Sequence, residues 1–564
     1  VVDDLTVSDD LTVTDDLIVG GDIDLEGSID VNGTTNLDAV DIDGAVQIDA
    51  TLSVGVNDTG YDVKFFGATS GKYVLFDESA DTFFVSGDLA TVTAGTSNFV
   101  AGVNAGNSIQ SGGNYNVVVG DEAGTAITTG DHNTAVGYQA GVAVTTGVQN
   151  TLIGGLAGDA NTSASNNTAV GYSSLGANTT GDNNTAIGQL SLTTNTTGRF
   201  NVASGVDSLR RNTTGSFNTA GGYTALEDNT TGANNVAYGA YALGANTTAS
   251  NNTAVGYQAL DANTTGANNT AIGSSALTAN TTASSITALG AYALQANTTG
   301  ANNTAVSTSL VTNTTGVNNT AVGLNALYYN TTGTDNNAFG LSTLQACTTG
   351  YNNSGFGGGT SYLAGALQSI TTGYRNSGFG NGAMGSTTTG IHNVAVGDAS
   401  LYTNSTGSNN VAVGQGALVA ATTASENTAV GYQAGYSNTT GTYNIASGAY
   451  SLHTNSTGNY LSSYGWKSLF ANTTGSYNTA IGNQALLSNT TASDGTAVGY
   501  QTLYSNTTGG QNTGVGRKAL YTNSTGDNNA AVGFNAMFYN TTGADNTALG
   551  TNTLQANTTG TYNT

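Results

Sequence analysis

Three pairs of adjacent aspartates near the N-terminus are the residues of this chain best suited to metal chemistry. Ca²⁺ takes roughly 6–8 oxygen ligands, and stacking of successive hexads would bring these carboxylates together. The chain has neither an EF-hand loop nor a nonapeptide calcium repeat, so plain solvation of an acidic segment is the favoured alternative. Structural Ca²⁺ is thus the one cofactor that the sequence suggests. The candidate ligands are Asp3, Asp4, Asp9, Asp10, Asp15 and Asp16.

The histidines and the remaining acid pairs are too scattered for catalysis. His132, His392 and His453 fall in different repeats, and the adjacent acids Asp121 and Glu122 read as ordinary surface. Catalysis requires several titratable groups that converge on one site. We therefore predict no catalytic residues and a protein that is not an enzyme.

Charge is sparse and unevenly distributed. Charged residues make up 8% of the chain, against roughly 25% in an ordinary globular protein, and the net charge is −26. Of the 35 acids, 20 lie in residues 1–90. No basic cluster is dense enough for a nucleic-acid backbone, and no apolar run approaches the ~20 residues of a membrane span. Cys347 is alone, which excludes an intramolecular disulfide.

The secondary-structure elements that position these residues can be identified from internal repeats in the sequence. In residues 1–57, apolar pairs two residues apart, such as Leu5/Val7 and Leu11/Val13, recur every six residues. Residues two apart share one face of a strand, so this segment is predicted to be an acidic hexapeptide-repeat β-stalk. Residues 58–90 contain three strand-like runs, YDVKFF, KYVLFD and TFFVSG, and are predicted to be a small linking β-module.

Residues 91–564 repeat the motif N-T-A-[VI]-G-x-x-[AS]-L-x-x-N-T-T-G-x-x about 27 times, with a 17-residue period. Seventeen residues are too many for one strand and too rich in Gly for helices. The sequence predicts an all-β protein whose body is a parallel β-solenoid or β-roll with 17-residue turns. Since the chain opens at Val1 and stops inside a repeat at Thr564, we expect further sequence at both ends.

The apolar columns suggest how the turns pack. Val255 and Ile272 share one position of the repeat, and Leu260 and Leu277 share another, so each turn is expected to bury two apolar rungs. Ala254 precedes Val255 and is therefore expected to point outward. A small apolar outer face indicates close packing against sister chains, which predicts a side-by-side homotrimer.

Glycine and asparagine mark the predicted corners. Gly256 and Gly273 follow the strand, while Asn263 and Gly266 bound the constant N-T-T-G corner. Gly tolerates positive φ, and Asn bonds to nearby backbone groups. Stacked Asn residues are also expected to form amide ladders.

Two exposed residue types leave functional alternatives open. Aromatic residues that follow the repeat Gly could stack on sugars, although packing over the neighbouring turn is favoured. Thr264 and Thr265 would stack along one edge, which leaves an ice-binding solenoid as a remote alternative. The aromatic residues are Tyr172, Tyr257, Tyr432, Trp466 and Tyr500.

The body motif, as in NTAVGYQAL at 252–260, resembles the head repeat of trimeric autotransporter adhesins. Those heads are left-handed parallel β-rolls of three chains side by side; this chain differs in its longer repeat and its N-T-T-G corner. The succession of acidic hexads, linking module and N-T-A-V-G repeats also resembles bacteriophage tail-fibre proteins. This resemblance implies an extracellular, non-enzymatic fibre, in a virion or on a cell surface, that attaches to a glycan or protein receptor. The alternative is a cell-surface adhesin or a filament subunit.

Overall fold

The structure is a computed structural model that describes residues 6–10, 12–16, 18, 63–66, 73–77, 82–86 and 93–564. The chain divides into two compact units, residues 1–89 and residues 90–564. The described residues contain strands, turns and loops and no helix. Most of the predicted hexapeptide stalk lies outside the described residues, so its fold stays a prediction.

The first unit contains three strands in the segment predicted to link stalk and body. They are β1 (Val63–Phe66), β2 (Tyr73–Asp77) and β3 (Thr82–Ser86). β2 lies between the other two and pairs with both in antiparallel fashion. The three strand-like runs of the sequence therefore do form strands.

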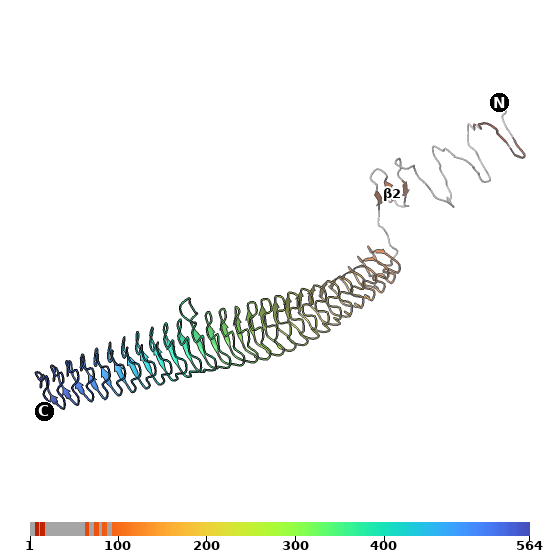
Figure 1. The fold of residues 1–564 in the computed structure, drawn as a ribbon. Coiled ribbons are helices and arrows are strands. Elements are labelled where there is room, and N and C mark those ends of the chain that lie inside the picture. The colour runs from red at the N-terminus through yellow and green to blue at the C-terminus, as the bar shows by residue number, and fades with distance from the viewer. Residues whose placement is uncertain are drawn as a thin grey trace. The chain divides into compact units, whose positions relative to one another are not determined.

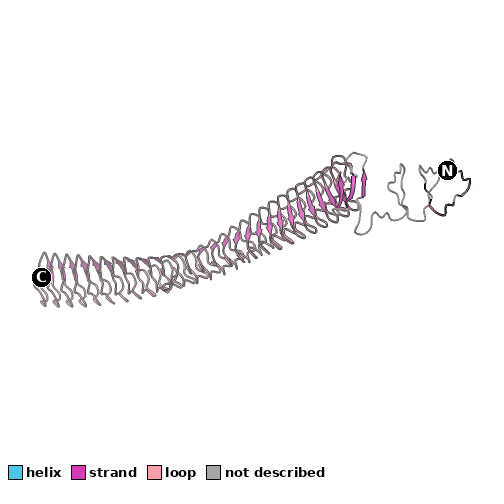
Figure 2. Cartoon of the chain, turned by 90° about the horizontal axis from the view of Figure 1, so that it is seen from above, coloured by secondary structure: helices cyan, strands magenta, loops and turns pink. Residues whose placement is uncertain are grey.

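The second unit, the body, is a parallel β-solenoid of about 27 turns, drawn out into a long rod (Figure 1). Each turn contributes one strand of three residues, and the strands lie in a single row along the rod (Figure 2). Val255 pairs with Ile272 one turn later, as the 17-residue period predicts. The fold class and the period are confirmed.

The 27 strands of the body pair in chain order. They are β4 (Phe99–Ala101), β5 (Val117–Val119), β6 (Thr134–Val136), β7 (Thr151–Ile153), β8 (Thr168–Val170), β9 (Thr185–Ile187), β10 (Val202–Ser204), β11 (Thr219–Gly221), β12 (Val236–Tyr238), β13 (Thr253–Val255), β14 (Thr270–Ile272), β15 (Thr287–Leu289), β16 (Thr304–Val306), β17 (Thr320–Val322), β18 (Asn337–Phe339), β19 (Ser354–Phe356), β20 (Ser377–Phe379), β21 (Val394–Val396), β22 (Val411–Val413), β23 (Thr428–Val430), β24 (Ile445–Ser447), β25 (Ser462–Tyr464), β26 (Thr479–Ile481), β27 (Thr496–Val498), β28 (Thr513–Val515), β29 (Ala530–Val532) and β30 (Thr547–Leu549).

Hydrogen bonds join neighbouring turns well beyond these short strands. The Leu260 N–H donates to the carbonyl of Ala276 at 2.9 Å. The Thr264 N–H donates to the carbonyl of Thr281, also at 2.9 Å. Leu260 lies in the left-handed region with φ of 55°, which costs about 1–2 kcal/mol for a side chain with a Cβ. Its bonded backbone and fully buried side chain offset that strain in every regular turn.

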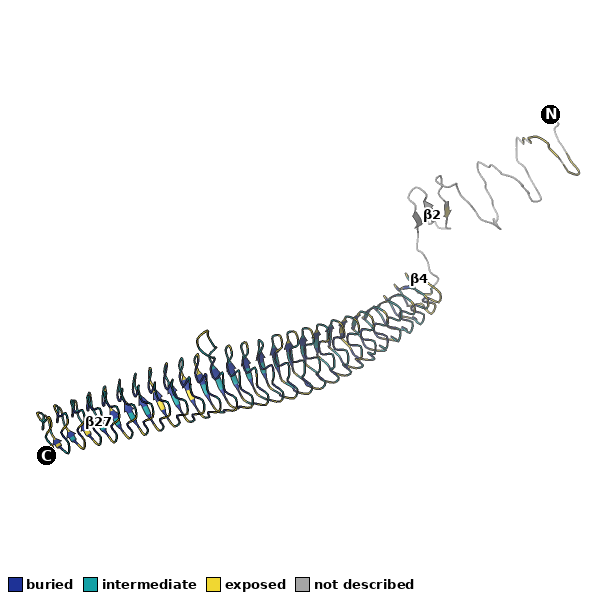
Figure 3. Cartoon of the chain, in the orientation of Figure 1, coloured by how far each residue is buried: buried dark blue, intermediate teal, exposed yellow. Residues whose placement is uncertain are grey.

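The strand side chains point in the opposite sense to the prediction. Ala254 and its neighbour Ala271 are fully buried, whereas Val255 is half-buried and Ile272 is 42% exposed. The alanine column therefore faces the interior and the Val/Ile column faces outward, and the expected outward alanine face was wrong. Figure 3 shows buried residues recurring in this way in each turn of the body.

The interior of a turn is too narrow for two large side chains, and this explains why alanine faces inward and Val or Ile faces outward. Leu260 and Leu277 fill it, as predicted, and leave room opposite them only for a methyl group. The arrangement is reversed in the turn of Leu152. There Leu152 occupies the alanine column and Gly158 occupies the leucine column. A Cβ built on Gly158 would lie 2.7 Å from a methyl group of Leu152. In this turn a large side chain in one column is thus exchanged for a glycine in the other.

Two columns of asparagine are buried in the core beside these apolar residues. The Asn252 amide Nδ2 donates to the carbonyl of Gly266 at 3.0 Å, and its Oδ1 accepts the N–H of Asn269 at 3.0 Å. Asn263 belongs to the second column, whose side chains bond to one another from turn to turn. The expected amide ladder is confirmed, but both columns are interior rather than at solvated corners.

The glycine that follows each strand is required by its backbone and its neighbours. Gly256 has a φ of 133°, Gly273 a φ of 134°, and a Cβ on Gly256 would lie 2.6 Å from the Gly273 carbonyl oxygen. Ser307 takes this place in one turn, with φ of 72°. Its turn is one residue short, since Thr304 pairs with Thr320.

The single long insertion leaves the solenoid register unchanged. Phe356 pairs with Phe379 across it, and the Ala366 N–H closes the loop on the Gly357 carbonyl at 2.9 Å. The loop projects from the rod (Figure 1), and Tyr362 within it is 94% exposed.

Candidate functional site

The acidic residues proposed for calcium do not form a described site. Asp3 and Asp4 lie outside the described residues, and Asp9, Asp10, Asp15 and Asp16 are exposed. Within the described part of the chain, no three His, Cys, Asp or Glu side chains gather in a way that could hold a metal ion. Calcium binding at the N-terminus therefore stays a prediction.

Each of the three histidines packs on aromatic rings of neighbouring turns. His132 stacks on Tyr115, with ring centroids 4.9 Å apart. His392 meets the edge of the Tyr374 ring. The His453 ring lies between two others, with centroids 5.1 Å from that of Tyr436 and 5.0 Å from that of Phe470.

No helix among the described residues is long and apolar enough to cross a membrane.

The outward face of the strand ladder runs along the whole described body. Both outward positions of each strand, represented by Thr253 and Val255 in β13, lack a charged residue in all 27 strands of the described body. The Val and Ile side chains on it remain partly exposed, with 38% for Ile153 and 44% for Ile187. We call this surface the outer strand face.

Phenylalanines replace the aliphatic residues in the middle of the outer strand face. Phe339 stacks on Phe356 with centroids 4.7 Å apart, and Phe356 stacks on Phe379 at 4.9 Å. The apolar row of this face therefore continues where its residue type changes.

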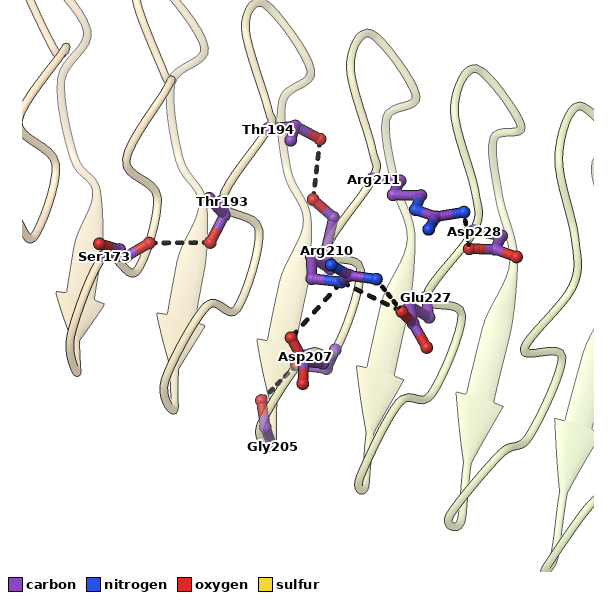
Figure 4. A network of polar contacts seen from close by, with 10 residues as sticks. Ser173, Thr193, Thr194, Gly205, Asp207, Arg210, Arg211, Glu227 and Asp228 are labelled. Carbon is purple, nitrogen blue, oxygen red and sulfur yellow. Dashed lines mark hydrogen bonds and ion pairs between the residues drawn. The ribbon is translucent and has the colours of Figure 1, made fainter.

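The edge of the rod that follows the repeat glycine carries most of the charge of the body. Arg210 pairs with Asp207 at 3.4 Å and with Glu227 one turn away, and Arg211 pairs with Asp228 at 2.7 Å (Figure 4). The basic pair Arg210/Arg211 thus neutralises a pair of acids in the next turn. The pKa of Arg210 is raised chiefly by its hydrogen bond to Glu227.

Farther toward the C-terminus the same edge changes character. We define the aromatic edge as the set of side chains one, two and five residues after the repeat glycine in the turns from Gly431 to Gly533. It contains eleven aromatic or histidine rings, three cations and no carboxylate. Its members are Tyr432, Gln433, Tyr436, Ala449, Tyr450, His453, Trp466, Lys467, Phe470, Asn483, Gln484, Leu487, Tyr500, Gln501, Tyr504, Arg517, Lys518, Tyr521, Phe534, Asn535 and Phe538.

Rings on this edge contact neighbouring turns, as the sequence favoured for the aromatic residues after the glycine. Tyr432 meets Tyr450 edge to face at 5.2 Å, and the Lys467 ammonium lies 4.8 Å from the Trp466 ring centroid. Farther upstream Tyr257 meets Tyr241 in the same way at 6.1 Å. These rings are nevertheless about half exposed, so contact within the chain does not remove them from the surface.

Sequence reasoning missed the aromatic edge as a unit, because its members are spread over three positions of the repeat. The signal was present in the period: aligning the turns places Tyr504, Tyr521 and Phe538 in one column. Their rings stack at 5.0 and 4.9 Å.

The body therefore offers two candidate surfaces, an uncharged outer strand face and an edge that changes from acidic to aromatic and basic. No family model, no curated protein and no solved structure matches this chain.

Proposed function

We propose that this chain is the shaft of an extracellular, non-enzymatic fibre, similar to a bacteriophage tail fibre, that assembles side by side into a homotrimer and serves attachment to a host or surface. The observation that carries the proposal is the outer strand face, which is uncharged over the whole described body and presents a row of mainly apolar side chains beside a row of mainly threonine. A soluble rod with an uncharged strip along its full length is suited to packing against copies of itself.

The size of the outer strand face supports this assembly. Burying the exposed part of one Val or Ile contributes on the order of 1 kcal/mol, or roughly 40 Å² of apolar area. Summed over the turns, one chain offers on the order of 1,000 Å², above the ~800 Å² per partner of a stable interface. Copies in register would also repeat the same contact at each turn, which favours alignment along the rod.

A paired substitution tests the assembly. In Val255→Asp/Ile272→Asp, two carboxylates would be buried between chains, which disfavours association while leaving the interior of each chain unchanged. We expect light scattering to give a trimer mass for the unmodified chain and a lower mass for this variant, with equal circular dichroism.

Thr265→Asp/Thr282→Asp is the matched control, because both threonines are exposed at the same corner of the turn, which reads N-T-T-G at Thr265 and N-T-T-A at Thr282, away from the outer strand face. The control should remain trimeric. A monomeric unmodified chain would refute the assembly.

The second candidate is a cell-surface adhesin or filament subunit, which the same outer strand face would serve equally well. Sequencing of the complete reading frame distinguishes the two. A baseplate-attachment or chaperone domain would select the tail fibre, and a signal peptide with a membrane anchor would select the adhesin. The receptor, in either case, is a cell-surface glycan or protein.

A further inference from the structure

We propose that the aromatic edge binds an acidic polysaccharide in which carboxylated and neutral sugars alternate. This inference deepens the attachment role proposed above and rests on it. It is carried by the spacing of the exposed rings, by the cations among them and by the distribution of acids around the same turns.

The exposed rings recur at every second turn. Tyr432, Trp466, Tyr500 and Phe534 all follow the repeat glycine directly, and each is 42–44% exposed. Two turns separate consecutive rings by about 10 Å, which is too far for them to stack on one another. Each of the four residues thus stays about two-fifths exposed, at a spacing close to the length of a disaccharide unit in an extended glycan.

A second row of rings lies five residues after the repeat glycine. Tyr504, Tyr521 and Phe538 lie one turn apart and stack face to face, so most of their surface is used within the chain. Stacked rings have little conformational freedom left to lose when a ligand binds. This second row is therefore a rigid part of the edge.

The cations of the edge have no carboxylate partner. Lys467 lies over Trp466, and Arg517 lies 5.9 Å from the Tyr500 ring centroid and 5.6 Å from that of Phe534. Lys518 lies 5.0 Å from the ring of Tyr521. Within residues 93–564, the ion pairs are those of Arg210 and Arg211.

Acids are placed elsewhere in these turns. Asp494, Asp527 and Asp545 are the acids between residues 431 and 550, and all three lie at the corner after the N-T-T-G segment. In a chain with a net charge of −26, an edge with three cations and no acid is a local reversal of sign. An anionic ligand is the one that this reversal favours.

The density of positive charge selects among anionic polymers. Lys467 and Lys518 are three turns apart, or about 14 Å. A nucleic-acid strand carries a phosphate roughly every 3.4 Å and would be poorly neutralised here. Amide side chains stand between the cations, and Gln501 and Gln484 are linked by a 2.8 Å hydrogen bond. Rings that stack on sugars, amides for hydroxyls and three cations at two levels of the edge together fit a polysaccharide in which only some of the sugars carry a carboxylate.

The chain contains its own probe, because Trp466 is its sole tryptophan and lies on the edge. Hyaluronan oligosaccharides, in which uronic acid and a neutral sugar alternate, are titrated into the full chain while Trp466 fluorescence is recorded. We expect a saturable change whose affinity falls as salt is raised. Cellohexaose, which is neutral, and oligo-dT serve as comparison ligands.

Three variants locate the site. Tyr500→Ala and Arg517→Gln/Lys518→Gln should each weaken hyaluronan binding roughly tenfold, and the double variant should also lose most of the salt dependence. Tyr257→Ala is the matched control, since it removes a half-exposed ring from the same repeat position in a turn without a cation. Its affinity should equal that of the unmodified chain.

The proposal is overturned if hyaluronan gives no saturable change, if cellohexaose binds as tightly, or if oligo-dT binds more tightly. Equal losses in Tyr257→Ala and Tyr500→Ala would also contradict it. Light scattering on the same samples keeps the two proposals apart: a monomeric chain that binds hyaluronan refutes the trimer alone, and a trimer that does not bind refutes the edge alone.

Discussion

Asn280 and Asn263, one turn apart in the interior of the body, are joined side chain to side chain, with Nδ2 of Asn280 donating to Oδ1 of Asn263 at 2.9 Å. Where the column is uninterrupted, each buried amide thereby serves as a partner for the next. An amide column of this kind fixes the register of the turns, because a shifted turn would leave buried polar groups without partners.

The amide ladder gives the first prediction. Asn263→Ala removes the donor to Asn246 Oδ1 and should destabilise the adjoining turns by about 1–3 kcal/mol. Native-state hydrogen exchange on the whole chain, read by mass spectrometry, should show faster exchange in those turns. Cys347→Asn is the converse test, because Asn330 Oδ1 lacks a partner where Cys347 interrupts the column. It should slow exchange there, and faster exchange would contradict the ladder's role.

The exchange of volume between two core columns gives the second prediction. Leu152→Ala leaves a cavity opposite Gly158 and should cost about 2–5 kcal/mol. Gly158→Leu added to it should recover most of this loss, because the φ of Gly158, 57°, matches the φ of 55° at which Leu260 is accommodated. Thermal unfolding of the single and double variants checks this. Gly158→Leu alone should overpack the core and destabilise it.

The environment of His453 gives a prediction about pH. Burial, aided by the charge of Lys467, lowers the pKa of His453 below its ordinary value of 6.5. As pH falls below about 6.5 the unfolded chain gains a proton that the folded chain resists, so local stability should decline until the lowered folded pKa is passed. His453→Phe preserves a ring between Tyr436 and Phe470 and should reduce this decline. Hydrogen exchange at pH 7.5 and 5.5, on both proteins, measures the difference.

The insertion gives the fourth prediction. Deletion of the six residues 359–364 should leave the solenoid intact, since Phe356 already pairs with Phe379 in register. We expect unchanged circular dichroism, mass and hyaluronan affinity. Loss of the folded body would show that the loop takes part in the packing of the turns beside it.

The period and the strand positions were predictable, whereas the direction of the side chains was not. The repeat glycine locates each strand because its backbone conformation excludes other residues, so Val255 could be paired with Ile272 from the sequence. Hydrophobicity alone predicts that Val255, the larger residue of the pair Ala254/Val255, faces the interior. The narrow core reverses that assignment, and a hint was available in Leu152, whose size is matched by a glycine elsewhere in its own turn.

The burial of the asparagines could not be predicted from the sequence for a related reason. Polarity places an isolated asparagine at the surface, and only stacking supplies the partner that makes burial of Asn252 and Asn263 favourable. The aromatic edge likewise emerges only when rings from separate turns are brought side by side. Sequence reasoning thus missed which side chains the stack buries and which rings from separate turns it brings together.

The hydrogen bonds between turns, such as that from Leu260 to Ala276, run along the rod, and this has a mechanical consequence. Tension applied to one end of a single chain loads the bonds of the terminal turn before those of the next. A turn that detaches releases about 55 Å of chain in exchange for about 4.8 Å of rod. A single body would therefore lengthen one turn at a time under tension and dissipate mechanical energy as it does so. Copies packed along the outer strand face would share the load and raise the force needed to detach the first turn.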